Sequence, residues 1–394
     1  MKWVLRIVVP LLGLLLALEL LSHLADSKAD PARIAGNQPG FWEKCSRAYL
    51  DPAAQKNRLA RTEAHPYLGY ALKAGWQSPP GSAQQCSHNA LGLRGKETTW
   101  EKPAGTFRIL TLGGSSVYGQ SESHDSKVWS QRLEDLANEG RGTPRIEVIN
   151  GGCSGYTSYE MLAQLAFRGV HLDPDLVVLY ESVNDMRAAL YTAGASEPAR
   201  DNTHWRLAWP VDRPSTLESL FENSRSYLIF RRYFTNYVQT RADLGFYAMV
   251  NYDPKSSELY CNRSRGGWPE GRVPEQGLAN YRHNLESLIS VAQAGGARVF
   301  IATQALMEWD FAGRECPEVQ IATFRRIQAI QREVASARGV ALGETGAAIE
   351  AADATHFTDT GKHLFKNDVH PFDEGSELIA RTVLAELRRQ GLLP

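Results

Sequence analysis

From Thr106 onward the chain alternates short apolar stretches with longer amphipathic ones. The short stretches are rich in β-branched residues and predict strands, whereas apolar positions three and four residues apart predict helices. Strands alternating with helices favour a parallel sheet covered on both faces, and five of them suggest a flavodoxin-like, three-layer α/β/α sandwich. The predicted strands are 107–112, 145–150, 175–180, 298–303 and the less apolar 339–342. The predicted helices are 127–138, 157–168, 278–294, 320–337 and 374–389.

One stretch interrupts this alternation. Residues 187–277, between the third and fourth predicted strands, are much longer than an ordinary crossover. The part from Glu222 to Val238 has a helical pattern. A long insert beyond the carboxyl ends of strands is typical of a lid or a substrate wall, and an additional helical hairpin that stabilises the fold is the alternative.

Residues 26–104 show little periodicity and scattered prolines. They predict an irregular N-terminal extension that packs on a core domain formed by residues 105–394. Within the extension, residues 65–70 and 89–95 are interpreted as short strands joined by turns.

The N-terminus carries a second kind of signal. Lys2 and Arg6 flank an uncharged apolar run from Ile7 to Leu18, which further leucines extend. A membrane-spanning helix needs about 20 mostly apolar residues, so residues 1–25 predict a transmembrane anchor. The leading basic residues predict that the N-terminus stays in the cytoplasm and that the remaining chain lies outside it, which is the periplasm if the cell is Gram-negative. A cleaved signal peptide is the alternative, with small residues at 27–29 far past the apolar core.

Composition narrows the class of partner. The chain has 394 residues, 43% of them hydrophobic and 22% charged, so it can bury a large core. Its 43 basic and 44 acidic residues give a formal net charge of −1, which offers no electrostatic reason to expect nucleic acid. We expect a small molecule or a neutral polymer. The sequence contains no metal-ligand cluster, phosphate-binding loop or dinucleotide fingerprint, so no metal and no cofactor is expected.

The five cysteines form no CxxC pair. If the body of the protein is exported, sequence order suggests disulfides between Cys45 and Cys86 and between Cys261 and Cys316. This assignment omits Cys153, which is interpreted as a packed small residue because nothing identified nearby would support a thiolate.

The first candidate for chemistry follows the first strand of the core. The strand stops at Gly113-Gly114, Ser115 comes next, and Gly119 closes the turn. Glycines allow the backbone to turn tightly and to approach a ligand closely. Ser115 would then stand at the carboxyl end of a buried strand, where open α/β sheets bind their ligands. Ser116 is the neighbouring candidate, but its spacing to Gly119 is less suitable.

Three further polar blocks lie where they can reach the same sheet edge. Residues 150–158 follow the second strand, residues 181–185 follow the third, and residues 365–371 precede the final helix. Because the carboxyl ends of parallel strands share one edge, a serine, a backbone amide, an asparagine and a histidine are expected to meet there.

Together these four blocks resemble the SGNH, or GDSL-type, hydrolase superfamily over residues 106–386. The resemblance implies that Ser115 is the nucleophile and His370 the base that removes its proton. It also implies that the Gly152 N–H and the Asn184 side-chain amide donate to the oxyanion.

Two substitutions within the blocks depart from this family. Gly114 stands where the name-giving aspartate would be, and Ser182 replaces a usual glycine, which would narrow the pocket without removing a catalytic group.

The acid of the triad departs from the family more seriously. The family aspartate precedes the histidine by three residues, and that position is Asn367, whereas Asp368 is two residues before His370. Either Asp368 orients the imidazole through a shifted turn, or Asn367 does so without charge, or the site works as a dyad. We expect Asp368, because a carboxylate also stabilises the imidazolium that forms.

The expected function is a serine ester hydrolase that acts through an acyl-enzyme on O-acyl esters of a glycan or lipid outside the cytoplasm. Acyl transfer to a sugar hydroxyl would use the same serine and is a close alternative. A non-catalytic glycan-binding or assembly protein that keeps the fold is the alternative from another class, suggested by Asn367 and by the tryptophans of the insert. Sequence leaves the oligomeric state open.

Overall fold

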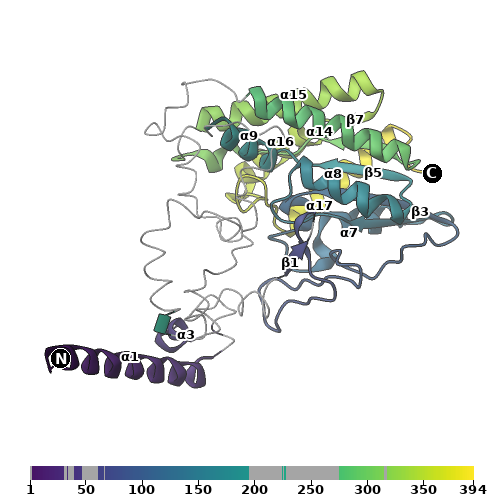
Figure 1. Ribbon diagram of the computed structural model, residues 1–394. Coiled ribbons are helices and arrows are strands. Elements are labelled where there is room, and N and C mark those ends of the chain that lie inside the picture. Colours follow the sequence, from purple (N-terminus) through teal and green to yellow (C-terminus); the bar gives the residue numbers. More distant parts are fainter. Residues whose placement is uncertain are drawn as a thin grey trace. The chain divides into compact units, whose positions relative to one another are not determined.

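The computed structural model describes residues 2–30, 33, 40–46, 61–65, 67–194, 224, 226–227, 275–314 and 317–394 (Figure 1). These residues fall into two compact units. The larger holds the described residues of 63–77, 83–206 and 248–394, and the smaller holds those of 1–62, 78–82 and 207–247. The predicted helix at 222–238 and the remaining insert lie almost wholly outside the described residues.

The larger unit is built on a five-stranded parallel sheet with the order β4-β3-β5-β6-β7. In chain order this is 2-1-3-4-5, so the flavodoxin-like prediction is confirmed. The central strand β3 pairs with both β4 and β5. The strands are β3 (Thr106–Gly113), β4 (Arg145–Asn150), β5 (Leu176–Tyr180), β6 (Arg298–Ala302) and β7 (Ala341–Gly343).

Helices cover both faces of this sheet, as Figure 1 shows. Side chains alternate along a strand, so neighbouring residues of β3 enter different cores: Leu110 and Leu112 pack with α8, α9, α14 and α15, whereas Ile109 packs with α7, α16 and α17. The helices are α7 (Trp129–Asn138), α8 (Ser158–Phe167), α9 (Val183–Gly194), α14 (Glu275–Ala294), α15 (Pro317–Arg338), α16 (Thr345–Thr360) and α17 (Asp373–Arg389).

Two of these helices were not predicted. α16 buries Ile349 as its one large apolar side chain and is otherwise rich in alanine and threonine, so no apolar stripe indicates it. α9 begins inside the polar block at 181–185, for which the sequence predicts no helix. Packing of α9 against α14 and α15, which are distant in sequence from it, stabilises a helix that local pattern does not indicate.

The segment before the core contains two short strands that overlap the predicted stretch 65–70 only at its ends, whereas residues 89–95 form turns and an isolated bridge at Arg94 in place of the predicted strand. β1 (Thr62–His65) and β2 (Gly69–Leu72) form a two-stranded sheet. Within the larger unit, the Tyr70 hydroxyl donates to the Ser154 carbonyl at 2.5 Å, and the Tyr156 hydroxyl donates to the Tyr70 carbonyl at 2.6 Å. The extension is therefore hydrogen-bonded to the loop that carries Gly152.

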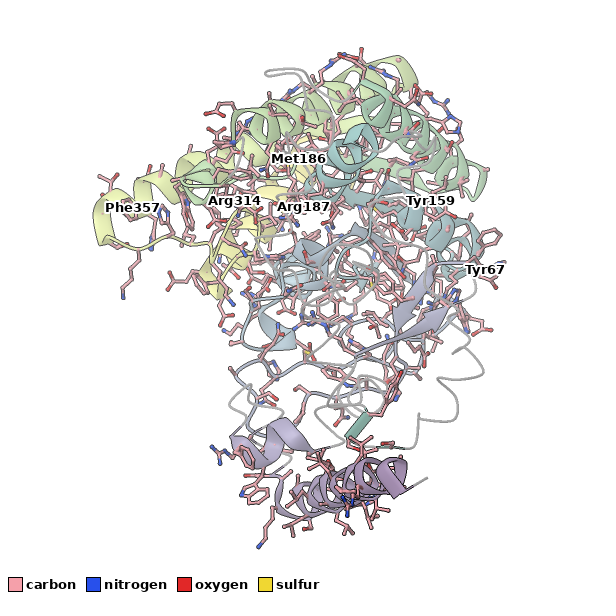
Figure 2. All side chains as sticks on the ribbon, turned by 60° about the vertical axis from the view of Figure 1, so that its left-hand side comes forward. Tyr67, Tyr159, Met186, Arg187, Arg314 and Phe357 are labelled. Carbon is pink, nitrogen blue, oxygen red and sulfur yellow. The ribbon has the colours of Figure 1, made fainter. Side chains whose placement is uncertain are left out.

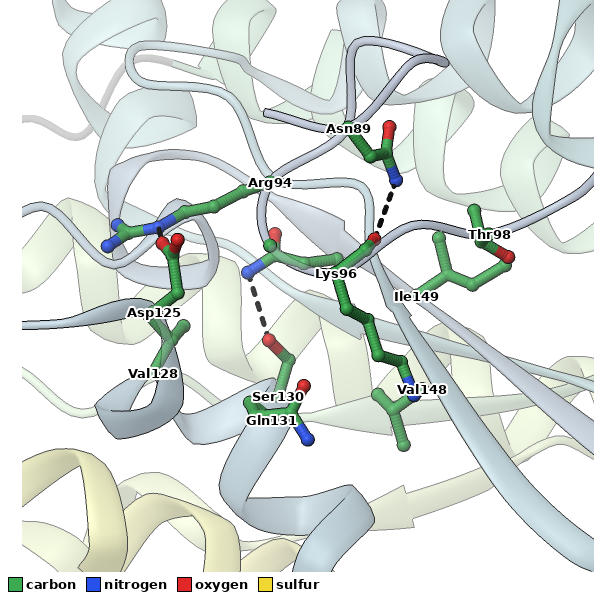
Figure 3. Close-up of a pocket in the computed structure, with 12 residues that line it drawn as sticks. Asn89, Arg94, Lys96, Thr98, Asp125, Val128, Ser130, Gln131, Val148 and Ile149 are labelled. Atoms are coloured by element: carbon green, nitrogen blue, oxygen red, sulfur yellow. Dashed lines mark hydrogen bonds and ion pairs between the residues drawn. The ribbon is translucent and has the colours of Figure 1, made fainter. Parts of the chain in front are cut away.

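Arg94 makes the second connection between the extension and the core. Its Nε donates to Asp125 Oδ1 at 2.9 Å, at one end of a small pocket (Figure 3). Its Nη1 donates to the Tyr118 carbonyl at 2.7 Å and also to that of Gly119. The guanidinium thus holds the end of the turn that carries Ser115.

The smaller unit contains the N-terminal helix α1 (Lys2–Lys28). Of the described helices, this one is long and apolar enough to cross a membrane, over Val8–Lys28. Leu12, Leu16 and Leu20 on this helix are exposed. An anchor and a signal sequence both have this form.

The predicted disulfides stay predictions. Cys261 and Cys316 lie outside the described residues, as does the side chain of Cys45. Cys86 Sγ is 3.6 Å from the Tyr118 hydroxyl, and Cys153 is buried beside Gly152.

Candidate active site

Ser115 begins the short helix α6 (Ser115–Tyr118) directly after β3. Gly114 is the N-cap, and Gly119 ends the helix in the left-handed region at φ 87°, which favours glycine. Because Ser115 is the first helical residue, its N–H has no acceptor within the helix. The turn therefore presents a hydroxyl and an unsatisfied amide at the carboxyl edge of the sheet.

His370 reaches this serine from the far end of the chain. Its Nε2 lies 2.7 Å from Ser115 Oγ. The loop that carries it is closed by hydrogen bonds from Lys366 N to the His370 carbonyl, 2.8 Å, and from Phe372 N to the Leu364 carbonyl, 2.9 Å. The structure thus brings together the predicted nucleophile and the predicted base.

Asn367 is the residue behind the imidazole. Its Oδ1 is 2.8 Å from His370 Nδ1 and also accepts the His370 backbone N–H at 3.1 Å. A second backbone N–H, from Val369, points at the same atom at 3.3 Å, which identifies it as the amide oxygen. An amide oxygen can only accept, so Nδ1 carries the proton and Nε2 is the acceptor for the Ser115 hydroxyl.

The expectation that Asp368 orients the ring is wrong. Its buried carboxylate instead accepts hydrogen bonds from Arg187 at 2.9 Å and Arg314 at 3.2 Å. Figure 2 labels these two arginines. Burial alone would raise the pKa of Asp368, but the charges of Arg187, Arg314 and His370 together outweigh it and hold that pKa below its usual value. The turn directs residue 367 toward the ring and residue 368 toward the arginines. The residue behind the ring is therefore three positions before His370, as in the family, but it is an amide in place of the aspartate.

The two predicted oxyanion donors lie against the nucleophile turn. A Cβ added to Gly152 would lie 2.3 Å from Tyr118 N, and one added to Gly114 would lie 2.3 Å from Asn184 Nδ2. Both donors hold protein acceptors in this structure: Gly152 N–H donates to Asn150 Oδ1, and Asn184 Nδ2 to the Tyr156 carbonyl, each at 2.9 Å. Catalytic hydrogen bonds are often formed fully only in the presence of substrate.

Ser116 has a different environment from Ser115. Its hydroxyl donates to the Val369 carbonyl at 3.0 Å and accepts from Gln304 Nε2 at 2.9 Å. The first bond joins the nucleophile turn to the histidine loop and the second joins it to the segment after β6, so Ser116 holds these segments together.

Three charged residues at the site were missed from the sequence. Arg187 and Arg314 bind Asp368, and Glu181 lies buried beside Asn184. Helical spacing could have indicated Arg187, because it follows Asn184 by three residues and so lies on the same face of α9. No local signal indicates Arg314, which reaches the site only through the tertiary fold.

The parallel sheet and the serine–histidine pair at its carboxyl edge have the form of a serine hydrolase. The chain belongs to the GDSL-like lipase/acylhydrolase family, whose model matches residues 111–378. It is accordingly an enzyme that hydrolyses ester bonds.

Solved structures similar to this chain include three hydrolases. A catalytic mutant of the acetylxylan esterase Axe2 from Geobacillus stearothermophilus is 15% identical, with a TM-score of 0.42 over 71% of this chain and 94% of that one. A putative GDSL-like lipase from Parabacteroides merdae is 12% identical, with a TM-score of 0.42 over 73% and 96%. The lipase/acylhydrolase from Enterococcus faecalis is 16% identical, with a TM-score of 0.40 over 72% and 96%. A comparison with curated proteins gave no match.

Proposed function

We propose that this enzyme cleaves O-acyl esters through a covalent acyl-enzyme on Ser115. The observation that carries the proposal is the 2.7 Å distance between Ser115 Oγ and His370 Nε2. A serine hydroxyl is a weak nucleophile until a hydrogen-bonded base takes its proton. Since Asn367 fixes the proton on Nδ1, the imidazole is in the tautomer that can accept the serine proton.

The reaction follows from this arrangement. Ser115 Oγ attacks the ester carbonyl while its proton passes to His370, and the imidazolium then protonates the leaving alcohol. Water, activated by the same imidazole, attacks the acyl-enzyme and releases the acid.

Three donors are proposed for the oxyanion: the Ser115 N–H, the Asn184 side chain and the Gly152 N–H. Removing one such donor typically costs about 10²–10³ in rate. The Gly152 N–H must turn from Asn150 Oδ1 toward the substrate, or share itself between them, to take part.

Asn367 distinguishes this site from one with an aspartate. An amide orients the imidazole but adds no charge to stabilise the imidazolium. The Asp368 carboxylate pairs with Arg187 and Arg314, and its remaining influence on the imidazolium is coulombic.

The proposed substrates are O-acyl esters of a glycan or lipid outside the cytoplasm. Support comes from α1, whose apolar stretch follows Lys2 and Arg6 and fits an uncleaved anchor with the catalytic unit exported. Alkaline extraction of membranes from cells expressing the full chain, combined with protease access to the catalytic unit, tests this placement. Release of the full-length protein from the membrane at high pH would contradict this placement. So would a catalytic unit that externally added protease cannot reach, because it would then lie in the cytoplasm.

Labelling with a fluorophosphonate probe tests the nucleophile. We expect an adduct on the peptide that contains Ser115, lost in Ser115→Ala and kept in Ser116→Ala. Hydrolysis of p-nitrophenyl acetate should disappear with the label. Labelling or hydrolysis that persists in Ser115→Ala would overturn the proposal. Adding an oligosaccharide during turnover separates hydrolysis from acyl transfer, since transfer produces acetylated oligosaccharide in place of free acetate.

A further inference from the structure

Glu181 is a buried carboxylate that the proposed mechanism does not use. It follows β5 directly and is 3% exposed. An ionisable side chain is seldom buried unless it is paired or hydrogen-bonded, so its contacts matter.

The Glu181 carboxylate connects two parts of the site. Oε2 accepts the Gly114 N–H at 2.8 Å, and Oε1 accepts the Asn184 N–H at 2.8 Å and the Ser182 N–H at 3.0 Å. The side-chain Nδ2 of Asn184 is 3.4 Å from Oε2. Every one of these partners is an N–H donor, which suits an ionised acceptor. Burial raises the pKa of Glu181 to about 8, although the backbone N–H groups oppose that rise, so the variants below are compared above that pH, where the wild-type carboxyl is ionised.

The carboxylate occupies the space that a side chain at position 114 would need. A Cβ built on Gly114 would lie 2.5 Å from Glu181 Oε2 as well as 2.3 Å from Asn184 Nδ2. The aspartate implied by the family resemblance therefore does not fit beside Glu181. In this chain the carboxylate at the nucleophile turn comes from the end of β5, and Gly114 makes room for it.

We infer that Glu181 is a positioning residue for the oxyanion hole, which sets the Asn184 amide and the peptide before Ser115 in their reactive places. The inference rests on the proposed function of Ser115. Gln304 braces the neighbouring backbone independently, since its Oε1 accepts both the Ser182 and the Val183 N–H at 2.9 Å. The start of α9 thus stays anchored when Glu181 is altered. Altering Glu181 should therefore change mainly the positions of the Asn184 amide and of the peptide before Ser115.

Glu181→Gln is the principal variant, because it keeps the shape of the side chain but replaces one carboxylate oxygen with an NH₂ group. That NH₂ group, a donor, then faces either the Gly114 N–H or the N–H groups of Ser182 and Asn184, which are donors as well. Glu134→Gln is the control: Glu134, on α7, is buried too and accepts a backbone N–H, from Val148 of β4 at 2.7 Å, while its other oxygen pairs with Lys96. With p-nitrophenyl acetate we expect kcat of Glu181→Gln to fall by about 10²-fold while KM stays within about twofold, since only transition-state contacts are lost. Glu134→Gln should keep the kcat of its folded fraction.

A double-mutant cycle checks the route of the effect. If Glu181 acts through Asn184, then Glu181→Gln should cost several-fold less kcat in an Asn184→Ala background than in the wild type. Should Glu181→Gln not fold, Glu181→Asp, which keeps the charge but shortens the side chain, takes its place and should lower kcat in the same way.

The outcomes separate the two proposals. Persisting hydrolysis in Ser115→Ala would reject the proposed function whatever Glu181 does. Loss of activity in Ser115→Ala together with a wild-type kcat in the folded Glu181 variants would reject only the inference. A raised KM at constant kcat in the Glu181 variants would reject it too, as would an equal loss of kcat in Glu134→Gln.

Discussion

The Asn367 side-chain oxygen accepts the hydrogen bond from His370 Nδ1 at 2.8 Å, in the place where this family has an aspartate. The bond fixes the tautomer and orientation of the imidazole without adding charge. The activity of this enzyme is therefore expected to depend on geometry behind the histidine more than on an ion pair.

Replacing Asn367 tests this dependence. Asn367→Ala removes the acceptor and leaves the ring free to rotate, so we expect kcat for p-nitrophenyl acetate to fall by about 10²-fold. Asn367→Asp keeps the acceptor and adds the charge that stabilises the imidazolium, so it should match or exceed the wild-type kcat. A wild-type kcat in Asn367→Ala would show that the serine–histidine dyad is sufficient.

Asp368 is predicted to matter for stability. Asp368→Asn removes the charge of the carboxylate that Arg187 and Arg314 share, and should lower the free energy of unfolding by about 2 kcal/mol, between the values typical of exposed and buried pairs. Its folded pKa lies below the usual 3.8, so this contribution is present above that pH and is lost as pH falls through the folded pKa.

Urea unfolding at neutral pH and kcat per folded molecule check this prediction. The folded fraction of Asp368→Asn should lose less activity than Asn367→Ala. A loss as large as that of Asn367→Ala, at unchanged stability, would return the orienting role to Asp368.

Gly152 is predicted to tolerate no side chain. A Cβ there would meet Tyr118 N at 2.3 Å and Val117 C at 2.6 Å, both of them in the nucleophile helix. Gly152→Ala should therefore displace Ser115, lower kcat by about 10²-fold and destabilise the fold by about 1–3 kcal/mol. Gly142→Ala is the control, because a Cβ at that position meets nothing within 4 Å. Equal melting temperatures and rates for both variants would contradict the packing argument.

Glu122 is predicted to make stability depend on pH. Its carboxyl is fully buried and accepts from Ser376 at 2.9 Å, and burial raises its pKa from 4.5 to about 7. Because the folded pKa is raised, the contribution is complete below pH 4.5 and is lost as pH rises through about 7. The loss is at most about 3–4 kcal/mol.

Unfolding by urea between pH 4.5 and 8 measures this effect. Glu122→Gln cannot ionise, so its stability should decline less over this range than that of the wild type. The exposed Glu139→Gln should follow the wild type. Parallel curves for all three proteins would show that Glu122 stays ionised in the fold.

The sequence by itself determined the sheet, its order and the pair of residues proposed to react. Strands and amphipathic helices can be predicted locally, because the spacing of their apolar residues is visible in a short window of sequence. A parallel sheet brings its strand ends to one edge, so the sequence could place Ser115 and His370 together although they are far apart in the chain. Their order in the four blocks carried the family resemblance as well. α16 escaped prediction because it buries too few large apolar residues to show a stripe.

Only the tertiary structure decided what surrounds that pair. One residue of difference in a turn reverses the direction of a side chain, so the sequence alone could not tell whether residue 367 or residue 368 faces the ring. Arg314 lies more than fifty residues from Asp368 and meets it only after the sheet has formed. Glu181 lies in a block already recognised, yet its contact with Gly114 depends on two strands lying side by side. Direction and burial are properties of the packed chain, and they decide which charges meet the reacting atoms.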